Sequence, residues 1–131
     1  MRGAKPHMKE DAESIRDALP APDWLSADAI AEWNRVIQIL VDRRILTHAD
    51  LASLENFCVA IGTVREMERT IQAEGYTYVS DTGIKRHPAV AIQAEAMTRA
   101  RLLAAELGLT PVSRSRPTIR DDADDDSLLD T

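Results

Sequence analysis

Aromatic residues and cysteine are both scarce in this chain. Only five of its 131 residues are Phe, Trp or Tyr, so a hydrophobic core must come mainly from Ala, Leu, Ile and Val. That composition favours helices over a β-sandwich or a β-barrel. The single cysteine, Cys58, excludes an intrachain disulfide framework and a cysteine-based zinc cluster, and it fits a reducing cytosol.

Long apolar runs are also missing. No uninterrupted apolar stretch approaches the roughly 18 to 20 residues that a membrane helix needs, and no apolar signal segment follows the first six residues. We therefore expect one soluble, intracellular domain with no membrane partner.

The sequence contains none of the residue patterns that nucleotide hydrolysis or metal binding requires. It has no G-x-x-x-x-G-K-[ST] loop, and its three histidines, His7, His48 and His87, lack metal-ligand spacing. Cys58 has no base near it in sequence, and the aspartates near the C-terminus lack the Gly and Glu of a calcium loop. We expect no catalytic residue, no metal and no cofactor, so the chain is predicted not to be an enzyme.

Charge is distributed very unevenly along the chain. The net charge of −6 equals the charge of residues 121–131, which carry six aspartates and no Lys or Arg, and this leaves about zero for residues 1–120. Basic residues lie on both sides of the central part, and those predicted to bind DNA are Arg2, Lys5 and Lys9 before it and Arg114 and Arg116 after it. Separated basic arms suit contacts with a polyanion, while an acidic tail can compete with it. Solvated ends without any such role are the alternative.

Apolar periodicity predicts two closely linked helices. Ser26 can cap a helix over 27–43, with an apolar stripe formed by Ile30, Trp33, Ile37, Leu40 and Val41. Thr47 and Asp50 repeat the capping pattern before a second, much longer helix that ends near Glu74. The apolar stripe of this long helix is too extensive for one small chain to cover, so it predicts an oligomer interface formed by Leu51, Leu54, Phe57, Ile61, Val64 and Ile71.

A small β-hairpin and a third helix should follow Gly75. The β-rich residues 76–79 and 84–87 flank a turn, and they place Lys85 and Arg86 together as further candidates for phosphate contact. Pro88, with His87 near the cap, starts a helix whose Ala-rich face includes Ala89, Ile92 and Ala96 and which Gly108 stops. The expected organisation is a flexible basic arm over 1–22, a helical core and oligomerisation domain over 23–110, and a flexible tail with an acidic end over 111–131.

Several segments together resemble one family, the phage terminase small subunits of tailed siphophages and prophages. The segments are Arg2-Gly3-Ala4-Lys5-Pro6, Pro22-Asp23-Trp24-Leu25-Ser26 with Ala31-Glu32-Trp33, Leu46-Thr47-His48-Ala49-Asp50, Gly83-Ile84-Lys85-Arg86-His87-Pro88-Ala89, and the run from Ala104 to Arg114 that contains Leu107-Gly108-Leu109-Thr110-Pro111. Their order and spacing carry the resemblance over roughly residues 2–116. Ala4 stands where this family often has another basic residue, and the Asp-rich tail is not part of the pattern.

The resemblance implies a mainly α fold: a helical hairpin with one long helix, a small β-hairpin and a C-terminal helix, assembling as a ring oligomer. It also implies a non-catalytic subunit that recognises viral double-stranded DNA and regulates the large terminase subunit, which holds the ATPase and nuclease, during genome packaging. Such a protein acts in the host cytoplasm and is not expected in the mature virion.

Two other functions are compatible with the same residues. The two short-linked helices around Arg43 to Thr47 could belong to a helix-turn-helix transcriptional regulator, although Asp50 and Glu55 at the start of the second helix are unsuited to the major groove. A structural adaptor without affinity for DNA is the third option. Measuring DNA binding together with subunit mass separates the three.

Overall fold

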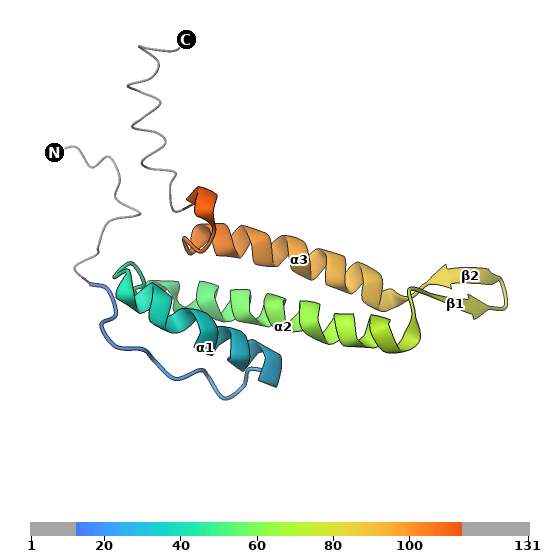
Figure 1. Ribbon diagram of the computed structural model, residues 1–131, viewed down its shortest axis with the longest axis horizontal. Helices are drawn as coiled ribbons and strands as arrows, with labels where there is room; N and C mark the ends of the chain where they lie inside the picture. The colour runs from blue at the N-terminus through green and yellow to red at the C-terminus, as the bar shows by residue number, and fades with distance from the viewer. Residues whose placement is uncertain (1–12, 114–131) are drawn as a thin grey trace, which may run out of the picture.

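Three helices and one β-hairpin make up the part of the chain that the computed structural model describes, residues 13–113. In chain order the elements are α1 (Ala27–Asp42), the 3₁₀ turn η2 (His48–Asp50), α2 (Leu51–Glu74), β1 (Thr77–Ser80), β2 (Gly83–Arg86) and α3 (Pro88–Glu106). α1 and α3 both pack on α2, which lies between them, and the hairpin extends beyond the helices at the α2–α3 junction (Figure 1). The mainly helical fold with a long helix, a β-hairpin and a C-terminal helix is as predicted, and ring assembly stays a prediction.

Local capping signals fix where the helices begin. The Ser26 hydroxyl accepts a hydrogen bond from the Ala29 amide at 3.2 Å, which satisfies one of the free donors at the start of α1. Before α2, the Asp50 carboxylate accepts from both the backbone amide and the hydroxyl of Thr47, at 2.9 and 3.0 Å. Both starts were predicted from the sequence, and η2 adds a tight turn between Thr47 and α2.

The core lies between α1 and α2. Four of the five predicted stripe residues of α1 are buried, and the fifth, Ile30, packs against them. Leu54, Phe57 and Cys58 meet this stripe from α2. At its far end α1 is joined to the end of α3, because Arg43 Nη1 donates to the Gly108 carbonyl at 2.7 Å.

Gly62 allows α1 to approach α2 closely. A Cβ built at this position would lie 3.0 Å from the backbone nitrogen of Ala29 and 3.3 Å from the Ser26 hydroxyl. A mid-helix glycine ordinarily costs about 1 kcal/mol relative to alanine. Here it leaves room for the capped start of α1 to lie directly against α2.

Small side chains give α3 a close contact with α2. Ala89, Ala96 and Ala100 are buried, together with Gln93, whose Nε2 donates to the Val64 carbonyl at 3.1 Å. Ile92 was expected on this face, but it is 47% exposed. The buried face is rotated away from Ile92 because Gln93 finds polar partners on α2.

The segment before α1 packs on the core instead of forming part of a flexible arm. Ile15 is buried and its amide donates to the Leu46 carbonyl at 2.7 Å, and the Leu19 carbonyl accepts from Trp33 Nε1 at 2.9 Å. The expected arm over 1–22 therefore differs from the structure over 13–22. The physical reason is that Ile15 and Leu19 supply apolar cover for the core, with Ile15 part of it and Leu19 packed against it.

The expected tail also begins with ordered structure. Residues 111–113 form a helical turn that starts at Pro111. The Thr110 hydroxyl accepts from the Ser113 amide at 3.1 Å, and the Ser113 hydroxyl accepts from the Thr110 amide at 3.2 Å. This is a reciprocal cap.

Within residues 13–113, no helix combines the length and apolar character needed to cross a membrane.

Candidate functional site

The β-hairpin is held rigidly where it leaves the helices. The His87 amide donates to the Tyr76 carbonyl at 2.7 Å, which closes the base of the hairpin. His87 Nδ1 accepts from the Ala89 amide at 3.0 Å and thereby caps α3, while Nε2 lies 2.7 Å from Glu74 Oε1 at the end of α2. Because Nδ1 is an acceptor, Nε2 carries the proton and donates to Glu74. His87 therefore ties α2, the hairpin and α3 together, beyond the capping role predicted for it.

The two strands give the hairpin two chemically different faces. Residues directly opposite each other in an antiparallel pair share a face, and successive pairs alternate. Val79 pairs with Ile84 and Thr77 pairs with Arg86, so these four residues lie on one face, called here the apolar face. Tyr78 pairs with Lys85 on the opposite face. Val79 and Ile84 are 82% and 74% exposed, which is unusual for an adjacent apolar pair.

Lys85 and Arg86 differ from most arginines of the helices in lacking an acidic partner. Among residues 13–113, neither of them forms an ion pair. By contrast, Arg35, Arg65, Arg69 and Arg99 each lie within 4.0 Å of a carboxylate. The hairpin thus carries two adjacent positive charges available to a polyanion, one on each face.

A polar seam of three arginines and two acidic residues joins α1 to α2. Glu32 is fully buried, and its carboxylate accepts two hydrogen bonds from Arg35, at 2.9 and 2.6 Å, and one from Arg65 at 3.1 Å. Asp28 pairs with Arg69 further along the same seam. Each of these arginines is paired with a carboxylate, so the seam holds the two helices together and carries a net charge of only +1.

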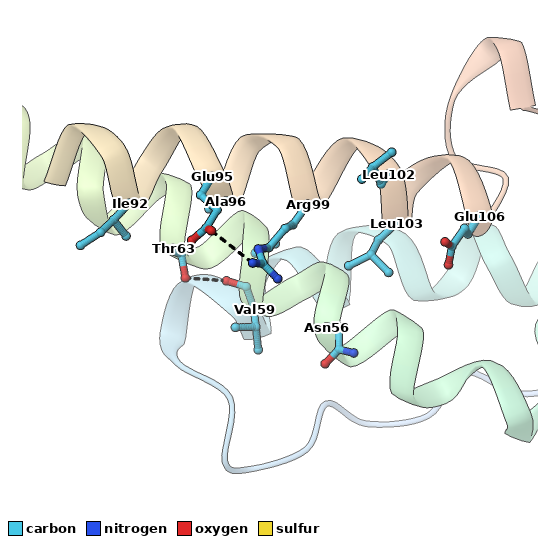
Figure 2. A pocket seen from close by; sticks show the side chains of 11 residues that line it. Asn56, Val59, Thr63, Ile92, Glu95, Ala96, Arg99, Leu102, Leu103 and Glu106 are labelled. Carbon is cyan, nitrogen blue, oxygen red and sulfur yellow. Dashed lines mark hydrogen bonds and ion pairs between the residues drawn. The ribbon is translucent and has the colours of Figure 1, made fainter. Parts of the chain in front are cut away.

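A groove runs between α2 and α3 (Figure 2). Its volume is about 650 Å³. Apolar side chains reach it from both helices, and its charged residues lie on α3. The apolar residues are Val59, Ala60, Ile92, Ala96, Leu102 and Leu103, and the charged ones are Glu95, Arg99 and Glu106.

Cys58 lies in the core and is not arranged for nucleophilic chemistry. Burial raises the pKa of its thiol to about 12, so the thiol stays protonated at neutral pH. Among the residues that the structure describes, no three His, Cys, Asp or Glu side chains come together as a metal site would need.

Comparison with known families decides what kind of protein this is. The family described as phage terminase, small subunit, matches residues 29–124, about three quarters of the chain. The match covers the elements from α1 to α3 except for the first two residues of α1. The chain belongs to the phage terminase small subunit family. Membership gives this small subunit a role in phage packaging, as the sequence predicted. No curated protein and no solved structure gives a significant match to it.

The structure separates the DNA-binding residues predicted for this small subunit into two groups. Lys85 and Arg86 both lie on β2 and are exposed, but on opposite faces of the hairpin. The other five, Arg2, Lys5, Lys9, Arg114 and Arg116, lie outside the described residues.

The six predicted interface residues lie on α2 where α1 and α3 of the same chain partly cover it. Leu54, Phe57 and Ile71 are buried within the single chain, while Leu51, Ile61 and Val64 are half-buried. The assumption that one chain could not cover this stripe does not hold for the first three, because α1 and α3 pack on α2. Their role in oligomerisation stays a prediction.

Sequence reasoning missed the groove and the seam. Glu32 lies within the apolar stripe of α1, and its burial depends in part on Arg65, 33 residues away, which the pattern of α1 does not indicate. The sequence did contain a signal for the exposed Val79–Ile84 pair. Side chains alternate between the two faces of a hairpin, so residues that pair across the strands lie on the same face.

The Asp28–Arg69 pair predicts a pH-dependent contribution to stability. A hydrogen bond from Arg69 holds the pKa of Asp28 below its ordinary value of 3.8. The folded state therefore releases this proton more readily than the unfolded state, and the stabilisation is present above the unfolded pKa and is lost as the pH falls through the folded pKa.

We expect Asp28→Asn to lower the urea midpoint at pH 7 and to have a much smaller effect near pH 2. Asp81→Asn in the hairpin turn, which has no such partner, is the control and should leave both midpoints unchanged. An equal loss for Asp28→Asn at both pH values would contradict the pairing.

Proposed function

We propose that this chain is the DNA-recognising, non-catalytic subunit of a genome-packaging motor. It binds viral double-stranded DNA, brings it to the large terminase subunit and regulates that subunit's ATPase and nuclease in the host cytoplasm. Family membership over residues 29–124 is the observation that carries the proposal. We propose further that it acts as a cyclic homo-oligomer with a core over 23–110, flanked by a basic N-terminal segment and an acidic-ended C-terminal one.

The unpaired cations of the hairpin support DNA binding by phosphate contact. Lys85 and Arg86 are exposed on β2, and the hairpin extends beyond the helices (Figure 1), which leaves both side chains open to a polyanion. Arg2, Lys5, Lys9, Arg114 and Arg116 add basic residues on both sides of the matched helices. Phosphate contacts of this kind release counterions, so affinity falls steeply as salt rises.

The salt dependence of DNA binding tests the assignment of Lys85. We expect Lys85→Gln to reduce the slope of log affinity against log salt by about one unit, because one phosphate contact is removed. Arg101→Gln, which removes the same charge from an exposed position of α3, is the control and should leave the slope unchanged. Fluorescence anisotropy with a labelled duplex gives both slopes. Equal slopes for Lys85→Gln and the unmodified chain would remove this lysine from the DNA contact.

A second measurement separates the packaging role from transcriptional regulation. The purified chain with ATP, magnesium and linear viral DNA should show no turnover alone, and it should stimulate ATP hydrolysis when the large subunit is added. DNA binding without stimulation would favour a transcriptional regulator, and stimulation without DNA binding would favour a structural adaptor.

A further inference from the structure

Two apolar features of this chain have no cover among residues 13–113. One is the Val79–Ile84 pair on the apolar face of the hairpin, and the other is the groove between α2 and α3, where Ile92 and Leu102 are 47% and 53% exposed. Exposed apolar surface of this kind marks interaction sites in soluble proteins.

The chain cannot bring these two features together by itself. The hairpin extends away from the helices at the α2–α3 junction (Figure 1), while the groove lies along the helices and reaches Glu106 at the end of α3. His87 fixes the base of the hairpin through Tyr76, Ala89 and Glu74, which opposes folding it back onto α3. Contact between the two features therefore requires a second chain.

The charges of the two features are complementary. The apolar face of the hairpin carries Arg86, and the turn at its tip carries Asp81. The groove carries Glu95 and Glu106, with Arg99 between them. Glu106 forms no ion pair among residues 13–113, so it is available to a cation from another chain. Apolar side chains flanked by opposite charges on the two surfaces suit a specific contact.

We propose that the hairpin of one copy inserts Val79 and Ile84 into the α2–α3 groove of a second copy, with Arg86 near Glu95 or Glu106. The inference deepens the self-assembly stated under the proposed function and rests on it. Because the two surfaces are different patches of the same chain, the contact is heterologous, and repeating it can close a ring. It uses the face with Arg86 and leaves Lys85 and Tyr78 on the opposite face. In the assembled ring Arg86 therefore serves the contact between copies, and of the two hairpin cations Lys85 alone stays available to DNA.

Two aspartate substitutions on β2 test this division of faces. Ile84→Asp places a charge on the face that enters the groove and should convert the oligomer to monomers at micromolar concentration, measured by native mass spectrometry. Lys85→Asp places the same residue on the opposite face, and it should keep the oligomer mass while weakening DNA binding. Both positions are exposed, so both variants should fold, which circular dichroism checks. An unchanged mass for Ile84→Asp, or monomers from both variants, would overturn the proposal.

Disulfide trapping between differently labelled chains tests the same contact directly. One chain carries Ile84→Cys and the other carries Leu102→Cys, and Cys58 is buried in both. Mild oxidation of the mixture should give a covalent dimer of the two chains, because a disulfide needs Cα atoms within about 7 Å. Ala94→Cys, exposed on α3 outside the groove, replaces Leu102→Cys in the control and should give none.

The results also distinguish failure of the contact from failure of the proposed function. An oligomer of unchanged mass with no Ile84–Leu102 cross-link, or with equal cross-linking at Ala94, would overturn the hairpin-in-groove contact while leaving DNA binding and assembly intact. A monomer of the unmodified chain would overturn the contact and the proposed self-assembly together. Loss of DNA binding with an intact cross-link would overturn only the DNA-binding part of the function.

Discussion

Replacing Trp33 by alanine should lower the free energy of unfolding by about 3 to 5 kcal/mol, the range found for buried Phe and Trp truncations. Trp33 is only 2% exposed and is among the largest fully buried side chains of the described residues. Its loss leaves a cavity in the hydrophobic core that α1 and α2 share. Because small domains are stable by only about 5 to 15 kcal/mol, this single change should bring the protein close to unfolding.

The same side chain also holds the segment before α1. Trp33 Nε1 donates to the Leu19 carbonyl at 2.9 Å, so the alanine variant should release residues 13–22 as well as weaken the core. Chemical denaturation gives the loss of stability, and limited proteolysis before α1 reports the release.

Trp24 supplies a matched control for Trp33. It is 59% exposed, so Trp24→Ala should change stability by no more than about 0.5 kcal/mol. If the two variants lose equal stability, the packing of α1 described for Trp33 is wrong.

Sequence patterns predicted the elements whose signals are local. The caps at Ser26 and His87, the stripe from Trp33 to Val41, and the turn of the hairpin each depend on residues within a few positions of one another. Such signals act before any tertiary contact forms, which explains why the helix limits differ from the expected ones by only a few residues.

Features that depend on distant residues could not be predicted in the same way. Gly62 is explained only by the start of α1, more than 30 residues earlier, and the burial of Ile15 is explained by Leu46. Ile92 fitted the apolar face predicted for α3, yet in the structure Gln93 is the buried residue there, hydrogen-bonded to α2, and Ile92 stays half-exposed. In each case tertiary packing decided between alternatives that the local pattern leaves open.

The same distinction between local signals and distant contacts holds for the candidate site. The sequence placed Lys85 and Arg86 together on a hairpin, and strand alternation, a local rule, separates them onto two faces. What each face contacts depends on a second molecule, whether DNA or another copy. That information is absent from any pattern within one chain.

Removing both arginine partners of Glu32 should destabilise the protein by about 3 to 5 kcal/mol, because an ionised carboxylate would then be buried without compensation. In the intact protein, Arg35 binds Glu32 with two hydrogen bonds and Arg65 adds a third from α2. The Arg35→Gln/Arg65→Gln double variant tests this by urea denaturation at pH 7. Each single variant should lose much less, since one arginine still pairs with the carboxylate.

Adding Glu32→Gln to the double variant provides the decisive control. The triple variant has a neutral amide in the same buried position, and burying a neutral polar group costs far less than burying a charge. Most of the lost stability should therefore return, although the triple variant, like the double variant, has neither ion pair of Glu32. If the triple variant were as unstable as the double variant, the loss would come from the arginine side chains packing on α1 and α2, and Glu32 would not be the origin of the effect. The side chains of Arg35 and Arg65 are 60% and 44% exposed, so their own packing contributes little. We therefore expect burial of the unpaired carboxylate to account for most of the lost stability.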